Sequence, residues 1–237
     1  MWAGRARGHS ASRAKVALLA RGRDGLDAAA REVQTSGGAA FVCVVDIADA
    51  AAVEAAADEV ERELGPIDVW INSAVAIVHS PVAEITAEEV RRVTQTSYLG
   101  FVHGTLAALR RMRARDHGTI VQVNSALAHR GIPLLSSYCA AKHAVQGFTE
   151  SLRVELRHDR SAVRVSVVEL AGINTPLYDV MRTRVPCRPR GLAPLYQPEV
   201  AAEAVLWAAE HRPRLVRVGG SAFGIVIANR FVPDLID

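Results

Sequence analysis

Ser125, Tyr138 and Lys142 have the residue types and spacing of an acid–base site. Tyr138 and Lys142 are four residues apart, so on a helix their side chains lie on the same face. The chain has 28 Lys and Arg residues, of which two are lysines. A lysine inside an apolar stretch is therefore notable, because its compact ammonium is not equivalent to a guanidinium. We expect the phenol and the ammonium to share one pocket.

These three side chains suit hydride transfer at an alcohol or carbonyl carbon. A free tyrosine has a pKa of about 10, and a nearby cation lowers that pKa toward the range useful for general acid–base catalysis. Ser125 can donate a hydrogen bond to a substrate oxygen on which charge develops. A nicotinamide is then the expected hydride carrier. The alternative is an amphipathic helix whose Tyr and Lys are unrelated to the upstream Ser.

The segment before Ser125 predicts where this site lies. Residues 118–124 form a short apolar, β-branched run, which is typical of a buried parallel strand. Ligands of open α/β sheets bind at the carboxyl ends of the strands. Ser125 therefore follows a strand at the edge of the sheet where a catalytic residue is expected.

Strand and helix patterns alternate along the chain, which predicts an α/β fold with a doubly wound parallel sheet between two helical layers. The predicted strands are 15–20, 40–45, 67–72, 118–124, 163–169 and 214–218. The predicted helices are 23–35, 49–64, 86–115, 136–158 and 199–210, with Asp49 and Thr86 as N-terminal caps. We expect one domain over residues 15–237, preceded by an atypical stretch, residues 1–14. Residues 171–198 are rich in proline and have no clear period, which is typical of a lid or substrate loop.

Composition excludes several other classes of protein. The 237 residues are 50% hydrophobic with a net charge of +3, and the arginines form no basic stripe, so we expect no nucleic-acid partner. Cys43, Cys139 and Cys187 are widely spaced, which favours free thiols and a cytoplasmic location. The histidines show no metal-ligand spacing, and no apolar run is long enough to span a membrane. The apolar residues 222–237 lack the basic face of a membrane-surface helix.

The order of motifs resembles the short-chain dehydrogenase/reductase family, whose fold is a Rossmann-type sheet. The resemblance runs from about Lys15 to the C-terminus. Its elements, in order, are Asp46-Ile47, Asn72-Ser-Ala, Ser97-Tyr-Leu-Gly100, Ser125, Tyr138-x3-Lys142 and Asn174-Thr-Pro176.

This resemblance implies catalytic roles for Ser125, Tyr138, Lys142 and Ser97. It implies cofactor contacts for the residues Arg21, Asp46, Ile47, Asn72, Tyr138, Lys142, Ile173 and Thr175. A guanidinium at Arg21 favours the 2′-phosphate of NADP(H) over the free hydroxyl of NAD(H), although NAD(H) stays possible because loops of this chain are rich in arginine. Asp46 is equally explained as a turn residue, and Thr175 as a helix cap before Pro176.

The chain departs from the family pattern at four places. No strand with a glycine-rich turn, which binds the pyrophosphate, is recognisable before Lys15, so we expect the first strand to be missing or replaced and the chain start to be truncated or misread. Ser73 and Val75 stand for Asn and Gly, Ser97 stands for Asn, and Leu170-Ala171 stand for Pro-Gly.

We therefore expect an oxidoreductase that uses NADP(H), or less readily NAD(H), on a small-molecule alcohol or ketone. The competing hypothesis is a non-catalytic scaffold, or an inactive truncated product, that cannot bind a dinucleotide. The resemblance also implies a homodimer or homotetramer that pairs through the helices at 86–115 and 136–158. The apolar faces of these helices are equally explained by packing on the sheet.

Overall fold

The computed structural model describes residues 14–186, 189, 191 and 193–231. Most of the atypical stretch 1–14, Cys187 and the end of the tail lie outside these residues. The strands are β1 (Lys15–Ala20), β2 (Ala39–Val44), β3 (Val69–Asn72), β4 (Val78–His79), β5 (Thr119–Ser125), β6 (Arg164–Leu170), β7 (Arg182–Thr183) and β8 (Leu215–Val218). The α-helices are α1 (Arg23–Thr35), α2 (Ala50–Leu64), α3 (Ala87–Thr94), α4 (Gly100–Arg115), α5 (Ser136–His158), α6 (Leu177–Val180), α7 (Pro198–His211) and α8 (Gly220–Phe231).

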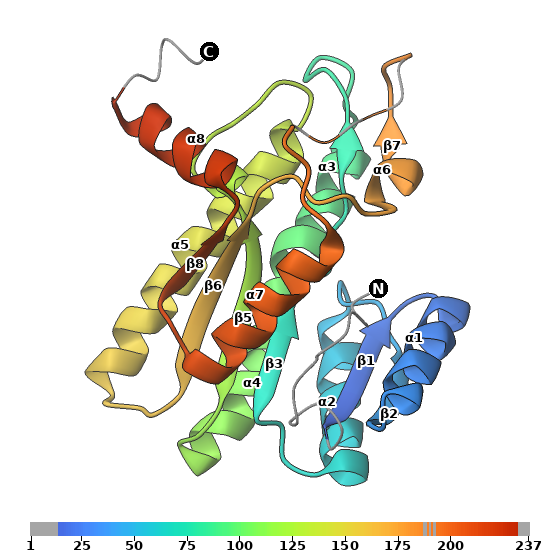
Figure 1. Cartoon of the computed structure of the whole chain (residues 1–237), viewed down its shortest axis with the longest axis vertical. Helices are drawn as coiled ribbons and strands as arrows, with labels where there is room; N and C mark the ends of the chain where they lie inside the picture. Colours follow the sequence, from blue (N-terminus) through green and yellow to red (C-terminus); the bar gives the residue numbers. More distant parts are fainter. Residues whose placement is uncertain (1–13, 187–188, 190, 192, 232–237) are drawn as a thin grey trace.

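All paired strands run parallel, and they form two main sheets. One sheet has the order β3-β5-β6-β8, and the other consists of β1 and β2. Helices cover both faces, as Figure 1 shows with α7 in front of the four-stranded sheet. The predicted doubly wound α/β fold is therefore confirmed. In the described part of the chain no strand pairs with the inner edges of β1 and β3, so the sheet is divided there.

A hydrophobic core joins the two sheets in place of strand pairing. Val53 and Ala57 of α2, Ala107 and Met112 of α4, and Ile120 of β5 are buried in one cluster. Ala17 and Leu19 of β1 and Trp70 of β3 pack against the same cluster. The helical layer formed by α2, α4 and α5 thus spans both sheets.

The opposite face of the four-stranded sheet packs on α7. Val121, Val123, Val168 and Val218 from three strands form a second cluster with Val205 of α7. Successive residues of a strand point to opposite faces, so Ile120, Gln122 and Asn124 face the helical layer of α4 and α5. Because β5 is buried at all seven positions, polar residues on that face need partners inside the protein.

Both predicted caps are present, and one predicted helix contains a π turn that was not predicted. The Asp49 carboxylate accepts hydrogen bonds from the amides of Ala51 and Ala52, and Thr86 forms a capping box with Glu89. The helix predicted at 86–115 is present without a break, and runs through α3, a π-helical turn at Gln95–Leu99, and α4. A π turn inserts extra backbone into a helix and often occurs at functional sites. The turn was not predictable from sequence period, because it is supported by tertiary hydrogen bonds between Ser97 and Ala76.

The predicted loop 171–198 contains secondary structure. It forms α6 and then β7, which pairs in parallel with β4, and Ile173 bridges to Tyr196. The apolar tail forms α8 up to Phe231. Within the described residues, no helix is long and apolar enough to cross a membrane, and no group of three acidic, His or Cys side chains is arranged to hold a metal ion.

Candidate active site

Ser125 is the last residue of β5 and begins the next turn. It is the N-cap of a short 3-10 helix, η3 (Ala126–Ala128), and its Oγ accepts a hydrogen bond from the amide of Leu127 at 3.2 Å. The side chain is 9% exposed. The strand fixes one end of this turn, and the capping bond orients the hydroxyl.

Lys142 lies in the second turn of α5, below the sheet end that carries Ser125. It is 3% exposed, and its Nζ donates a hydrogen bond to the carbonyl of Val123 at 3.0 Å. The ammonium is 4.5 Å from the ring centre of Phe101 and 5.7 Å from that of Tyr138. Burial lowers the pKa of Lys142 to about 7. The structure therefore brings Tyr138 and Lys142 together, as the i, i+4 spacing predicted.

The acidity of Tyr138 differs from the expectation that a cation would lower its pKa. Burial raises the pKa of Tyr138 to about 12, and a hydrogen bond with the Ser125 side chain acts in the opposite direction. The ammonium lies 5.7 Å from the centre of the ring, and desolvation is the largest influence on the phenol. Ser125 nevertheless lies close enough to Tyr138 to influence the pKa of its phenol.

Ser97 lies in the π turn and is fully buried. Its hydroxyl accepts from the amide of Ala76 at 2.8 Å and donates to the carbonyl of the same residue at 2.9 Å. This pair of bonds holds the segment after β3 against the helix. The side chain of Ser97 thus orients the backbone at Ala76, and none of the described hydrogen bonds joins it to Tyr138.

The side chain of Asn72 is buried and forms hydrogen bonds inside the protein. Its amide nitrogen donates to Thr105 and Gln122, both at 3.0 Å, and to the carbonyl of Phe101 at 3.4 Å. Its oxygen accepts from the Trp70 indole at 2.8 Å. The Asn72 network therefore ties the end of β3 to α4 and β5.

Arg21, Asp46 and Ile47 follow the carboxyl ends of β1 and β2. Burial alone would raise the pKa of Asp46, but the amide of Ala48 and the guanidinium of Arg92 hold it below its ordinary value, with a smaller effect from Arg21. Arg92 donates to the Asp46 carboxylate at 2.9 Å. Arg21 is exposed, so its guanidinium is accessible at this edge.

The Ile47 side chain explains Gly100 of the Ser-x-x-Gly motif. A Cβ at Gly100 would lie 2.3 Å from Cδ1 of Ile47, which no real contact permits. The ring of His103 is 2.9 Å from the Ile47 carbonyl. Gly100 therefore allows α4 to approach the turn after β2.

Ile173 and Thr175 follow β6, at the same end of the sheet as Ser125. Ile173 is buried, and Thr175 is partly exposed. The alternative that Thr175 caps a helix is not supported, because Pro176 is the N-cap of α6 and no side chain caps it. Farther along the same segment lies a shallow hollow of about 430 Å³, lined by residues Tyr178, Asp179, Met181, Thr183, Val185, Pro186 and Pro189.

Two buried carboxylates near the site were not predicted from the sequence. Glu169 on β6 is fully buried and contacts His129 and Arg217. Glu89 on α3 is 7% exposed and contacts Arg182 and Arg184. A charge inside the apolar run of β6 was the available signal for Glu169, but its partners lie 40 and 48 residues away along the chain.

The donor set fits one half of a dinucleotide better than the other. Lys142 has three N–H groups and, among the described contacts, one hydrogen-bond acceptor, and Tyr138 lies beside it, so these side chains suit a nicotinamide ribose. Arg21 and Asp46 suit the adenosine end. Between them, the described residues from Ala14 onward supply no glycine-rich turn for the pyrophosphate.

The parallel sheet, with a Ser, Tyr and Lys site at the carboxyl end of β5, defines a doubly wound α/β protein of the dinucleotide-binding type. A family model described as short chain dehydrogenase matches residues 4–185. The chain therefore belongs to the short-chain dehydrogenase family.

Curated relatives agree with this assignment. The chain is 30% identical over 226 residues to "Uncharacterized oxidoreductase YxnA" of Bacillus subtilis, a match that covers 94% of this chain and 64% of the relative. It is 33% identical over 205 residues to "Putative oxidoreductase SadH" of Mycobacterium tuberculosis, covering 83% and 74%. The chain thus spans about two thirds of the length of these relatives.

Solved structures show the same fold. A short-chain dehydrogenase/reductase from Burkholderia phymatum, in complex with NAD, aligns with a TM-score of 0.82 at 20% identity, over 94% of this chain and 86% of that chain. A short-chain dehydrogenase from Streptomyces avermitilis aligns with a TM-score of 0.76 at 23% identity, over 94% and 85%.

Proposed function

We propose that this protein is an NAD(P)(H)-dependent oxidoreductase that acts on an alcohol or carbonyl group. The observation that carries the proposal is the position of the buried Lys142 ammonium, which lies 5.7 Å from the centre of the Tyr138 ring and donates to the carbonyl of Val123, two residues before Ser125. All three groups lie at the carboxyl end of β5, where open α/β sheets bind ligands.

The chain's own residues would act on the substrate oxygen. Ser125 donates a hydrogen bond to that oxygen and polarises it. In reduction, Tyr138 gives its proton to the oxygen, and in oxidation it takes the proton back. Lys142 positions the nicotinamide ribose and stabilises the phenolate that Tyr138 leaves. A bound nicotinamide supplies or accepts the hydride.

For the cofactor we propose NADP(H) in preference to NAD(H). The exposed guanidinium of Arg21, at the end of β1, supports this choice because it would pair with a 2′-phosphate. Asp46 and Ile47 would flank the adenine, and Ile173 and Thr175 would border the nicotinamide. We assign Asn72 to holding the strand end rather than to direct contact, because its amide is already bonded inside the protein.

We propose a small-molecule substrate and assembly into a homodimer or homotetramer. Leu106 on α4 and Val154 on α5 are exposed large hydrophobic residues, 41% and 70%, which supports pairing through these helices. Cys43 and Cys139 are free, buried thiols, which supports a reducing compartment such as the cytoplasm.

The Tyr138→Phe variant tests the catalytic assignment. Turnover of a ketone by NADPH should fall by roughly a thousandfold, the scale of a lost general acid. Thermal stability should change little, because Phe keeps the buried ring and removes only the phenol oxygen. Activity retained in the folded variant would overturn the role of Tyr138.

The divided sheet favours a second candidate, a non-catalytic member of the family that holds no dinucleotide. Titration of the 237-residue chain with NADPH and NADH, followed by calorimetry, separates the two. Micromolar binding of NADPH with weaker NADH supports the enzyme and the role of Arg21. A folded chain that binds neither cofactor supports the second candidate.

A further inference from the structure

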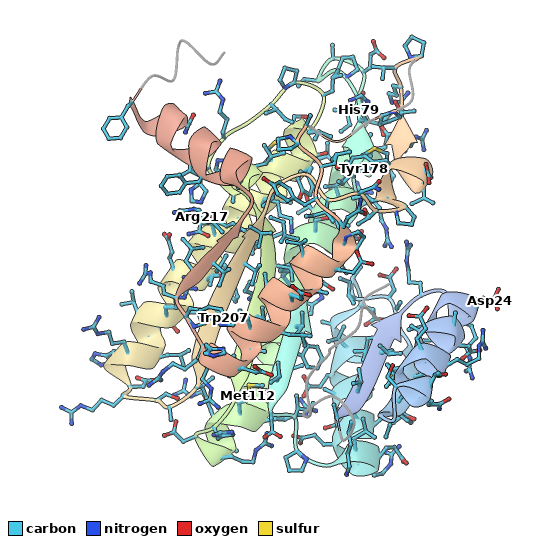
Figure 2. All side chains as sticks on the ribbon, in the orientation of Figure 1. Asp24, His79, Met112, Tyr178, Trp207 and Arg217 are labelled. Atoms are coloured by element: carbon cyan, nitrogen blue, oxygen red, sulfur yellow. The ribbon has the colours of Figure 1, made fainter. Side chains whose placement is uncertain are left out.

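A row of polar side chains crosses the sheet directly below the layer of Ser125. In the strand register, Asn124 of β5 pairs with Glu169 of β6, and Glu169 pairs with Arg217 of β8. These three side chains therefore point to the same face of the sheet. Figure 2 labels Arg217, which lies on β8 near the start of α8. The row connects the strand of the candidate active site with the last two elements of the described chain.

Glu169 is the central charge of this row. It is fully buried, and Nε of Arg217 donates to its Oε2 at 2.8 Å. Its other oxygen, Oε1, is 2.6 Å from Nε2 of His129. A buried carboxylate is costly unless its hydrogen-bond capacity is filled with good geometry, so Glu169 strongly restricts where the ring of His129 can lie.

His129 ends the turn that Ser125 begins. Ser125 is the N-cap of η3 and His129 is its C-cap. The strand holds one end of this single turn, and Glu169 holds the other end through the imidazole. The amide of Leu127, which orients the Ser125 hydroxyl, lies between the two fixed ends.

The same turn also holds α8. The side-chain nitrogen of Asn229 donates to the His129 carbonyl at 2.7 Å, and Nη1 of Arg130 donates to the Asn229 oxygen at 2.8 Å. Both ends of the Asn229 amide are thus bonded to residues 129–130. The position of α8 depends on the turn that carries Ser125.

We propose that Glu169 is a positioning residue. Through the ring of His129 it fixes the orientation of the Ser125 hydroxyl and the position of α8. The geometric part of this proposal concerns the ligand-free protein. Its consequence for turnover, a fall in kcat with little change in KM, rests on the function proposed above.

The test uses the Glu169→Gln variant and a matched control on the same strand. Gln has nearly the same side-chain volume as Glu. Its NH2 group cannot accept a hydrogen bond, so one of the two bonds that the Glu169 carboxylate accepts is lost. Ser166→Ala is the control, because Ser166 is also fully buried on β6 and bonds to Ala208 instead. Both changes should lower stability, so stability alone does not decide.

Two measurements on ligand-free protein decide. With tyrosine labelled at 13Cζ, the chain gives four signals, and Tyr138→Phe assigns the one from Tyr138. Glu169→Gln should shift the Tyr138 signal, since the Ser125 hydroxyl that influences the phenol would move with the turn. It should also speed amide exchange in residues 126–130 roughly tenfold, the scale of one charge-assisted hydrogen bond. Ser166→Ala should do neither.

Two further variants complete the design. His129→Phe keeps a ring of similar size at a side chain that is 26% exposed. It must also shift the Tyr138 signal. This variant replaces Glu169→Gln in the test if Glu169→Gln does not fold. Asn229→Ala should loosen α8 without moving that signal. An unchanged Tyr138 signal in folded Glu169→Gln or His129→Phe overturns the proposal, whether or not the chain later proves to bind a cofactor.

Discussion

At the scale of single residues, the candidate site is defined by burial more than by charge. Burial raises the pKa of Tyr138 to about 12 and lowers that of Lys142 to about 7. Both shifts favour the neutral forms, so burial makes ionisation of these two side chains less favourable. Phe101 and the Val123 carbonyl partly replace the water that the ammonium has lost.

Lys142→Met should change how stability depends on pH. From pH 7 to pH 10 the unfolded chain holds a proton on Lys142 that the folded chain has released, so wild-type stability rises with pH. Relative to the variant, the gain should be about 3 kcal/mol across this window. Urea unfolding of both proteins at several pH values measures it.

The control for this prediction is Lys15→Met. Lys15 is exposed and is the other lysine of the chain, so this variant separates the effect of losing a buried lysine from that of losing any lysine. If the stability of Lys142→Met and that of wild type changed with pH in the same way, the lowering of the Lys142 pKa by burial would be contradicted.

At the scale of elements, the sequence predicted those features that depend on residues close together along the chain. The cap at Asp49, the capping box at Thr86 and the buried strand before Ser125 follow from short patterns, and all three are present. The pairing of Tyr138 with Lys142 follows from helical period. The π turn was missed because it is supported by a tertiary contact, the two bonds between Ser97 and Ala76.

The candidate site was predictable only where its members are close in sequence or follow a strand end. Asn72 was identified from a motif, but its role depends on Trp70, Thr105 and Gln122, which three different elements provide. The contacts of Glu169 likewise require the sheet register. Propensity and period contain no information on such distant pairs.

Glu89 is the main polar link between α3 and the segment after β6. Its carboxylate is 2.6 Å from Nε of Arg182 and 3.0 Å from Nη2 of Arg184. The Thr86 amide and then the Arg184 side chain, against the opposing effect of burial, lower the pKa of Glu89 to about 2. The contribution of this ion pair to stability is therefore complete above the ordinary Glu pKa of 4.5 and is lost only as pH falls toward 2.

Glu89→Gln should free this segment without unfolding the sheet. We expect trypsin to cleave after Arg182 and Arg184 roughly tenfold faster, because local opening costs less once the charge is removed. Glu88→Gln is the matched control, since Glu88 is exposed and bonds to Arg91 on its own helix. Equal cleavage rates in the two variants would show that β4–β7 pairing alone holds the segment.

At the scale of the whole molecule, two sheets share one core, and among residues 14–231 as described no strand pairs between them. The contact between α2 and α4 carries this connection, and Arg111 is its most buried charge. Arg111 is 8% exposed and bonds to Glu54 at 2.8 Å and to Asp58, with Glu61 at 3.7 Å. These acids come from α2, so the pairs link the unit of β1 and β2 to the four-stranded sheet.

Arg111→Met should weaken this link and loosen residues 15–64 as a unit. The expected loss of stability is about 1–3 kcal/mol, less than for a fully buried pair because the acids are partly solvated. Hydrogen exchange should increase in β1 and β2 but not in β5 and β6. Arg110→Met, at a side chain that is 60% exposed, should have little effect, and an equal effect of both would contradict this role.

The divided sheet also bears on how the protein behaves in concentrated solution. In residues 14–72, the inner edges of β1 and β3 have no strand partner, and such edges are templates for pairing with other chains. β3 reads Val-Trp-Ile-Asn without a charged residue to block that pairing, and Val69 and Ile71 are each 41% exposed. We therefore expect the inner edges of β1 and β3, more than the net charge of +3, to limit the concentration at which the protein stays free of aggregates. Light scattering at increasing protein concentration measures this limit.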